Sequence, residues 1–493
     1  MISLDLSAGA RLRLRDPQAR AFWALALLLA ATFLLGGSAR GDAESLIILR
    51  PFAALLAGLG IWQLRLEHIQ KHKLVLGVAL ALTALPLLQL VPLPYAIWTS
   101  LPGRQQVADI DRIAGLGQIA RPISLVPDGT LNALLSLLVP LAALILGIQL
   151  GRLARAQLLP VLLGLIGASA LLGVLQIVNG PASPLYLYDI TNPGSAVGLF
   201  ANRNHQALLL ATSLPMLALW ASRDPRSSLL KMVGGAVALL GLIPLILITG
   251  SRAGAIAGLV ALLTLGLVAR CPAPPAAILD ATRRRPLRVP KFAGLGVASL
   301  AALALAALTI IVGRAEAWER LQTVFLGDDL RFRIVPTLVQ MFPKYWPFGT
   351  GLGSFEKIFQ AEEPDALLSP VYMNHAHNDW LETALTGGLP AVILLVVAAA
   401  CAAVSVFRQF LSKSGRSAPN RLARLGLIVV LLTALVSVSD YPLRTPLLQA
   451  VFVVAVLWAS CPMPQFETLT DSAENQVDIG RNEASEFTYA APR

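Results

Sequence analysis

Long apolar runs separated by short charged clusters dominate the sequence. A membrane-spanning helix needs about 20 mostly apolar residues, and twelve segments of roughly this length can be marked between the charged clusters. They lie near residues 20–38, 46–64, 74–91, 130–150, 157–178, 199–220, 232–249, 252–269, 293–312, 380–407, 425–440 and 446–460. This pattern predicts an all-α polytopic membrane protein with about 12 transmembrane helices.

The composition excludes most other classes of protein. Of the 493 residues, 56% are hydrophobic and only 14% are charged, whereas a soluble domain has roughly 25% charged residues. A soluble enzyme, a disordered protein and a DNA-binding domain are therefore poor fits. The net charge of +11 would suggest a nucleic-acid partner in a soluble protein, but here it raises the question of membrane orientation.

Lysine and arginine residues fix the expected orientation. If the N-terminus is cytoplasmic, 25 of the 39 basic residues fall in cytoplasmic segments, and the bias holds loop by loop. Cytoplasmic loops carry this excess in membrane proteins, so we expect an N-in/C-in topology and no nucleic-acid partner. Gly37-Ser38-Ala39 resembles a signal-peptide cleavage site, but the preceding apolar run is long and many spans follow it.

The predicted spans divide the chain into four parts. We expect helices 1–9 in residues 1–312, a large periplasmic loop in 313–379, helices 10–12 in 380–461, and a disordered acidic cytoplasmic tail in 462–493. Within the large loop, apolar residues spaced by three and four predict short amphipathic helices, namely Trp318, Leu321, Phe325, Phe332, Val335 and Val339.

Three smaller connecting segments and the cysteines carry weaker structural information. Residues 92–129 are proline-rich and read as an irregular outer loop, 179–198 form a polar and aromatic outer loop, and 270–291 form a proline- and arginine-rich inner tether. The three cysteines are expected on the inner side or within a span, so no disulfide is implied. They are Cys271, Cys401 and Cys461, and their spacing is not that of a zinc site.

The sharpest chemical signal lies where the large loop enters the tenth span, in the sequence Asn374-His-Ala-His-Asn-Asp-Trp-Leu-Glu382. A neutral imidazole suits a general base, so His375 and His377 are candidates, and Asp379 or Glu382 could orient the ring. Two other interpretations stay open. Asn378 or Asp379 could cap the helix with Glu382 completing a capping box, or the histidines could bind a metal if the segment is extended.

Cationic groups at the outer ends of other spans form a second signal. Asn202, Arg203 and Asn204 combine a guanidinium with two amides that could hold phosphate or sugar oxygens, and Asn378 is a further amide of this kind. Alternatively, Asn202 caps the helix and Arg203 extends to the interface. His205 is expected to be a packed interior residue.

Further arginines fall on the same side. Arg252 lies in the tight turn Thr249-Gly-Ser-Arg-Ala-Gly254, at a helix start that would favour an anion, and an ordinary interfacial turn is the alternative. Arg331 and Arg333 form a cationic pair in the large loop, or a solvated surface. The glycines of residues 349–353 lack the Lys and Ser/Thr of a P-loop and predict a turn.

The distribution of charge favours an enzyme over a transporter. Acidic residues are nearly absent from the middle of the spans, whereas a cation-coupled transporter usually needs them there. Arginines instead gather at the outer boundary, as a site for an anionic lipid-linked donor requires.

In order and content, these motifs resemble the O-antigen ligase/polymerase superfamily of bacterial membrane glycosyltransferases. The resemblance covers most of the chain. It rests on Gly198-Leu-Phe-Ala-Asn-Arg-Asn-His205, on Ser251-Arg-Ala-Gly254, on Arg331 through Phe355, and on His375-Ala-His-Asn-Asp-Trp-Leu-Glu382 with Gly388-Leu-Pro390.

The resemblance implies a reaction at the periplasmic face of the bacterial inner membrane. The donor would be a glycan on undecaprenyl diphosphate, and the acceptor a hydroxyl of lipid A-core or of a growing glycan. It implies no metal or other cofactor. His377 is the first candidate for the base and His375 the second, while Arg203 and Arg252 would bind the diphosphate, with Arg331 or Arg333 assisting.

The leading interpretation is an O-antigen ligase-like glycosyltransferase in contact with membrane lipid. A polymerase of O-antigen or exopolysaccharide repeat units differs only in its acceptor and stays open. A lipid-linked sugar transporter and a non-catalytic scaffold are rivals from other classes, and both would leave the loop histidine without a chemical role.

Overall fold

The computed structural model describes residues 16–222, 229–269, 333–368, 373–412 and 420–460. Several predictions of the sequence lie outside these ranges: the span at 293–312, the tether at 270–291, the helix around Trp318, the tail at 462–493, and Arg331. Cys271 and Cys461 are also outside them.

The described residues form an all-α protein. Its helices are α1 (Pro17–Leu35), α2 (Leu46–Trp62), α3 (Leu66–Lys71), α4 (Lys73–Gln89), α5 (Tyr95–Thr99), α6 (Gln105–Ile113), α7 (Pro127–Ser136), α8 (Leu138–Gly147), α9 (Arg152–Asn179), α10 (Arg203–Ala221), α11 (Leu229–Ile248), α12 (Arg252–Ala269), α16 (Val335–Tyr345), α17 (Phe355–Glu362), η3 (Asp365–Leu367), α18 (Asp379–Val406), η4 (Phe407–Leu411), α20 (Arg421–Val436), η5 (Pro442–Arg444) and α21 (Pro446–Ala459). The short strands β1 (Pro92–Leu93) and β2 (Arg121–Pro122) pair antiparallel.

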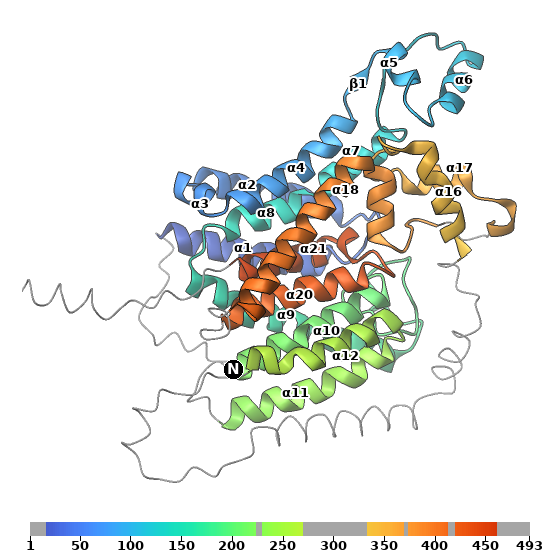
Figure 1. The fold of residues 1–493 in the computed structure, drawn as a ribbon. Helices are drawn as coiled ribbons and strands as arrows, with labels where there is room; N and C mark the ends of the chain where they lie inside the picture. Colours follow the sequence, from blue (N-terminus) through green and yellow to red (C-terminus); the bar gives the residue numbers. More distant parts are fainter. Residues whose placement is uncertain (1–15, 223–228, 270–332, 369–372, 413–419, 461–493) are drawn as a thin grey trace, which may run out of the picture.

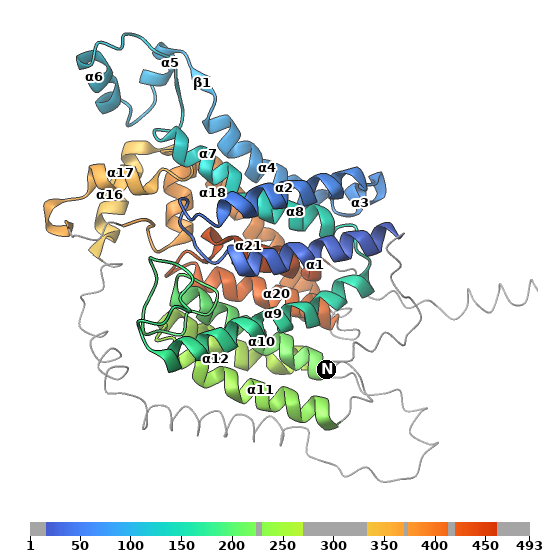
Figure 2. The ribbon, with the colours of Figure 1, turned by 180° about the vertical axis from the view of Figure 1, so that it is seen from behind.

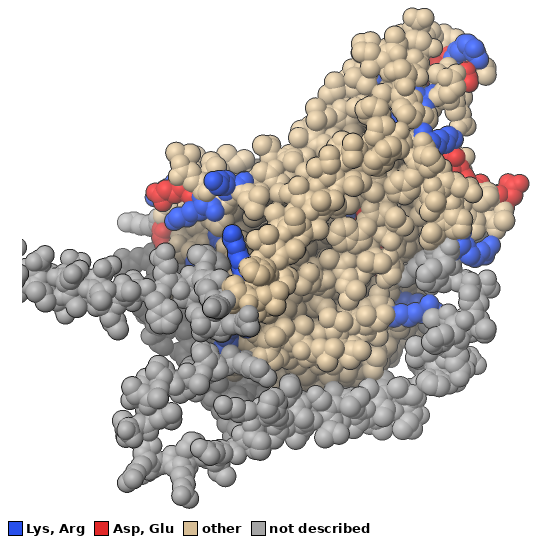
Figure 3. Space-filling view, viewed as in Figure 1, with Lys and Arg blue, Asp and Glu red and all other residues tan. Residues whose placement is uncertain are grey.

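Apolar helices of spanning length identify a multi-pass membrane protein. Five are long and apolar enough to cross a bilayer, and four described helices of 10–17 residues are also apolar. The most apolar is Asp379–Leu411, whose most apolar 18-residue stretch has a mean hydropathy of 2.7 and is almost entirely unburied within the protein. Figure 3 shows the same arrangement at the surface: charged side chains gather at the two ends of the helices, with a broad uncharged surface between them.

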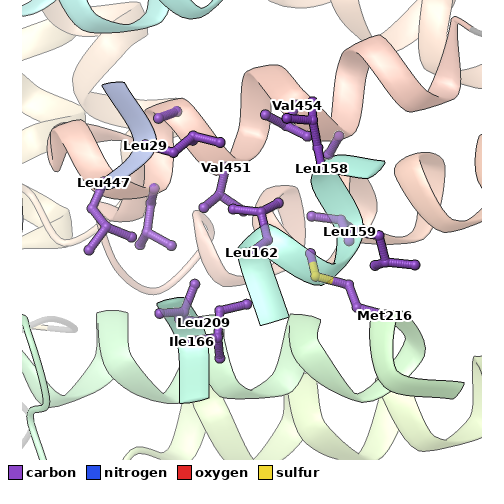
Figure 4. Close-up of a cluster of buried hydrophobic side chains, with 14 of the residues drawn as sticks. Leu29, Leu158, Leu159, Leu162, Ile166, Leu209, Met216, Leu447, Val451 and Val454 are labelled. Atoms are coloured by element: carbon purple, nitrogen blue, oxygen red, sulfur yellow. The ribbon is translucent and has the colours of Figure 1, made fainter. Parts of the chain in front are cut away.

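The helices pack in three layers around an apolar core (Figures 1 and 2). The middle layer contains α1, α9, α20 and α21, with α2 and α8 on one side and α10, α11 and α12 on the other. Figure 4 shows how the core joins the layers, because leucine and valine side chains from α1, α9 and α21 meet Leu209 and Met216 of α10. This packing positions the helix ends that carry the polar residues.

Three segments differ from the sequence prediction. The segment predicted at 130–150 is two helices, α7 and α8, separated at Leu137. The span predicted at 425–440 ends at Val436, so Asp440 lies in a loop. Residues 92–129 are not irregular, because they contain α5, α6 and the β1–β2 pair. Short polar helices carry too weak an apolar pattern to be recognised in a proline-rich segment.

The tenth predicted span is also interrupted. Gly388 has φ 65° and ψ −158°, which breaks α18 into a short part, 379–387, and a long lipid-facing part, 389–406. The loop around Gly351 satisfies the backbone groups that the break exposes. The Thr386 carbonyl accepts from Gly351 N at 2.8 Å and from Gln89 Nε2 at 3.1 Å, and Leu389 N donates to the Pro347 carbonyl at 2.8 Å. The glycine-rich turn therefore fixes the short part of α18.

A buried arginine joins this turn to the neighbouring loop. The Arg104 guanidinium donates to the carbonyls of Ile123 and Gly349 at 2.7 and 2.8 Å. Burial lowers the pKa of Arg104 to about 10, so it remains charged at neutral pH. Residues 92–129 and the glycine-rich turn are thus held as one unit against α18.

The close contact between α10 and α12 requires a glycine at position 254, and a substitution can test this. A Cβ atom on Gly254 would lie 2.2 Å from the Cβ of Ala207 in α10. We expect Gly254→Ala to lower the free energy of unfolding by about 1–3 kcal/mol, because the helices must separate. Thermal or chemical unfolding in detergent measures this change.

Gly266, in the same helix, provides the matched control. A Cβ atom there would meet nothing within 4 Å, so Gly266→Ala should be neutral or stabilise by about 0.5–1 kcal/mol. Equal effects of the two substitutions would contradict the close packing.

Candidate functional site

The segment before α18 places two histidines and two carboxylates at one end of the helix bundle. Asn378 caps α18, because its Oδ1 accepts from Leu381 N at 3.0 Å. Glu382 turns back to the preceding segment, where it accepts from Ala376 N at 2.9 Å. The capping role predicted for Asn378 is therefore present, and Glu382 serves the histidine segment.

His375 forms a close pair with Glu382. The His375 Nδ1 lies 3.0 Å from Glu382 Oε1 and 3.2 Å from Oε2. The Glu382 side chain is only 1% exposed and that of His375 is 16% exposed. A buried carboxylate that contacts one ring nitrogen fixes the orientation of the imidazole and leaves the other nitrogen available. Glu382 therefore makes the contact with His375 that the orienting role suggested from the sequence would require.

His377 has an unusual backbone and a different acidic neighbour. Its φ is 50°, and among the described residues it is the only one other than glycine with a positive φ. Such a conformation is sterically costly and is often found at functional sites. The His377 Nδ1 lies 3.5 Å from Oδ1 of Asp440, which is fully buried. The two histidines therefore have separate carboxylate neighbours.

Tyr441 connects the histidine segment to α10. Its ring centroid lies 4.5 Å from that of His375, 4.9 Å from that of His377 and 5.3 Å from that of His205. His205 is buried in the first turn of α10, as the sequence predicted for an interior residue. Segments that are far apart in the chain thus meet around one aromatic ring.

Arg444 compensates the two carboxylates of α18. Its Nε lies 3.0 Å from Asp379 Oδ1, and one terminal nitrogen lies 3.4 Å from Glu382 Oε1. Burial alone would lower the pKa of Arg444, but the carboxylates of Glu382 and Asp379 raise it above its usual value. The guanidinium therefore stays charged and holds η5 against the first turns of α18.

Asp379 forms hydrogen bonds that connect α18 to neighbouring segments. Besides Arg444, its Oδ2 accepts from Leu443 N and Ser437 Oγ, each at 3.3 Å, and its backbone N donates to the Ser437 carbonyl at 2.9 Å. These contacts tie α18 to the connection between α20 and α21. Of the two carboxylates proposed to orient an imidazole, Glu382 is the one in contact with His375.

Arg203 and Arg252 begin two adjacent helices that point the same way. Asn202 caps α10 through a 2.9 Å bond from Asn204 N, and Ser251 Oγ accepts from Gly254 N at 3.0 Å at the start of α12. A Cβ on Gly250 would lie 3.5 Å from a terminal nitrogen of Arg203, so this guanidinium lies over the turn that precedes Arg252. Two arginines and two helix N-termini make this region favourable for an anion.

The amides around Arg203 are largely engaged. The Arg203 backbone N donates to Asn192 Oδ1 at 3.0 Å, the side chain of Asn202 serves as the helix cap, and Asn204 is buried. Asn202 therefore caps α10, as one of the two interpretations predicted. Arg252, at the start of α12, is exposed at the surface.

Arg333 lies at the edge of the site. A terminal nitrogen donates to the Ala366 carbonyl at 3.0 Å, and the side chain is exposed. Its neighbour Ile334 packs in one apolar cluster with Met373 and Ala376, so α16 supports the histidine segment from outside. The predicted partner of Arg333, Arg331, is outside the described residues.

Asp440, Tyr441 and Arg444 were not predicted from the sequence. All three lie between α20 and α21, in the sequence Ser-Asp-Tyr-Pro-Leu-Arg. The apolar pattern placed Asp440 in a span and treated the rest as a turn. An acid, an aromatic residue and an arginine within five positions between two apolar runs are the signal that could have identified them.

The described side chains offer no group of three or more His, Cys, Asp and Glu residues arranged to hold a metal ion. His375 and His377 instead contact different carboxylates. The metal interpretation of the His-x-His pattern thus finds no additional ligand in the described part of the chain.

Comparison with known proteins identifies the segment that contains most of these residues. No match was found among curated proteins. Residues 235–396 match the family model described as O-antigen ligase. This segment includes Arg252 and the whole histidine segment through Glu382, whereas Arg203 and Tyr441 lie outside it. Residues 235–396 are therefore a segment of the O-antigen ligase type, as judged by this match.

Proposed function

We propose that the protein is an O-antigen ligase that moves a glycan from undecaprenyl diphosphate to a hydroxyl of an acceptor such as lipid A-core. The observation that carries this proposal is the junction at Tyr441, where His375 and His377 meet His205, two residues from Arg203. The two candidate proton acceptors and the start of α10, which carries Arg203, thereby lie at the same end of the bundle.

The proposed site faces the periplasm, in a protein with twelve spans and both termini in the cytoplasm. In support of this, Figure 3 shows charged side chains toward the two ends of the helices and a broad uncharged surface between them. The ends of the helices opposite the site carry basic residues, including Arg65, Lys71, Arg152 and Arg421. Because positive charge accumulates on the cytoplasmic side, the histidine segment belongs to the opposite side.

In the proposed reaction, His377 removes the proton from the acceptor hydroxyl while that oxygen attacks the anomeric carbon of the donor sugar. The bond between this carbon and the diphosphate oxygen breaks, and undecaprenyl diphosphate leaves with the bonding electrons. Arg203 and Arg252, together with the two helix N-termini, stabilise the negative charge on the leaving group. The proton on His377 then passes to the leaving group or to water. Because the arginines and helix N-termini stabilise the leaving diphosphate, the proposed reaction needs no metal.

Asp440 would position the His377 ring in this scheme, and Glu382 would do the same for His375. His377 is assigned as the base because it has a strained backbone and a partly exposed ring beside the buried carboxylate of Asp440. His375 remains the alternative, since both rings contact Tyr441.

The main alternative is a polymerase that joins repeat units, which would use the same donor chemistry with a different acceptor. A deletion strain distinguishes the two. A ligase defect leaves long lipid-linked polymer without surface polysaccharide, whereas a polymerase defect accumulates single lipid-linked repeats. A lipid-linked sugar transporter is a third candidate, and it would not form a glycosidic bond in purified form.

We predict that His377→Ala lowers the rate of glycan transfer by about 10²–10⁴-fold, because a positioned base contributes this much. The assay uses purified protein, a synthetic undecaprenyl-diphosphate-linked oligosaccharide and lipid A-core. Wild-type activity should be unchanged by EDTA.

His375→Ala is the matched comparison, with a smaller expected loss. If His375→Ala abolished transfer while His377→Ala retained it, the base assignment would be reversed. Loss of wild-type activity in EDTA would refute the metal-free reaction.

We further predict that Arg252→Gln slows transfer by about tenfold or more, because one charge-assisted contact to a phosphate is lost. The measurement is kcat/KM for the donor. Arg333→Gln is the control, since Arg333 contacts the Ala366 carbonyl at the edge of the site. An equal effect of both substitutions would indicate general electrostatic attraction and not a diphosphate site.

A further inference from the structure

Arg50 is a charged residue inside an apolar helix. It lies in the second turn of α2, in the sequence Leu-Ile-Ile-Leu-Arg-Pro. A charged side chain in such a helix is costly and usually marks a functional site. One terminal nitrogen donates to Asn132 Oδ1 of α7 at 2.5 Å. Its Nε is buried without an acceptor among the described residues, and within those ranges no carboxylate lies close enough to form an ion pair.

A small cavity opens beside this guanidinium. Its polar lining comprises Arg40, Arg50 and Arg444 together with Ser38, Asn132 and Ser136. Arg40 pairs with Asp42, and Arg444 pairs with Asp379, so Arg50 supplies the excess positive charge. The free volume is about 30 Å³, whereas one water needs at least about 10–15 Å³. The cavity therefore fits a single charged group and not a whole sugar.

The cavity is separate from the proposed diphosphate site. It is built from the α1–α2 loop, α2, α7, α8, η5 and the start of α21, whereas Arg203 and Arg252 begin α10 and α12. Figure 2 shows α2, α7 and α8 on one side of α21, with α10 and α12 on the other. Arg444 links the cavity to the histidines, because it also contacts Glu382, the partner of His375.

We propose that Arg50, with Arg40 and Arg444, binds one phosphate or carboxylate group of the acceptor. This inference rests on the proposed glycan transfer. The donor would lie at Arg203 and Arg252, on one side of the histidine segment. An acceptor anchored at Arg50 would present its hydroxyl from the other side. Arg50 would bind substrate without contacting the reacting atoms.

The first experiment measures anion binding independently of transfer. Inorganic phosphate is the probe, and its affinity is obtained from the rise in Tm of the purified full chain in detergent. We expect Arg50→Gln to weaken phosphate binding by about tenfold. Pyrophosphate, a probe of the Arg203 and Arg252 site, should stabilise wild-type and Arg50→Gln protein equally.

Arg112→Gln is the matched control, because Arg112 is an exposed arginine that pairs with Asp109. It should bind phosphate as the wild type does. Arg50→Lys keeps the charge and should retain part of the affinity. Unchanged phosphate binding by Arg50→Gln would overturn the proposal. Failure of both Arg50 variants to fold would also overturn it, since Arg50 would then be structural.

The second experiment identifies the source of the anion. With the acceptor varied, Arg50→Gln should raise KM by about tenfold, while kcat and the KM for the donor stay near the wild-type values. Dephosphorylated acceptor should show the same defect with wild-type enzyme. If phosphate binding depends on Arg50 but the acceptor KM does not, the acceptor assignment is wrong.

Nanodiscs with and without phosphatidylglycerol test a lipid head group as the occupant. Loss of the phosphate response only in the presence of that lipid would assign the cavity to membrane lipid and reject the acceptor. If the wild type transfers no glycan at all, the proposed function fails, whereas the phosphate measurement still decides whether Arg50 forms an anion site.

Discussion

Two carboxylates buried at the first turns of an apolar helix require a nearby positive charge, and Arg444 provides it. Isolated buried charges are unfavourable, and removing one partner of such a group typically costs about 3–5 kcal/mol. Arg444 comes from the connection between α20 and α21, so its contacts with Asp379 and Glu382 hold that connection against α18. Tyr441 is carried in the same connection. The position of the histidines relative to α10 therefore depends on this compensation of charge.

The apolar helices could be predicted from the sequence because lipid imposes a simple requirement on composition. Eleven of the twelve predicted segments coincide with described helices, and the twelfth, at 293–312, lies outside the described residues. The break at Gly388 was not predicted, although Gly388-Leu-Pro390 was recognised as a motif. Its stability depends on hydrogen bonds from Gln89 and Gly351, which no local pattern reveals.

The site itself could be predicted only in part. The histidine segment is compact in sequence and therefore visible, and Arg203 and Arg252 stand out at the ends of apolar runs. Asp440, Tyr441 and Arg444 act through partners more than 50 residues away, so their roles follow from packing alone. Arg50 was hidden for a different reason: a single arginine does not interrupt an otherwise strongly apolar segment.

The break in α18 has a mechanical consequence for an enzyme in a bilayer. The part beyond Gly388 exposes leucine, isoleucine and valine side chains, so its tilt must adjust to the thickness of the surrounding lipid. The part before Gly388 is instead anchored to other protein segments through Thr386 and Arg444. A change in lipid composition can thus tilt the outer helix while the histidines keep their positions, which separates the chemistry from the elastic response of the membrane.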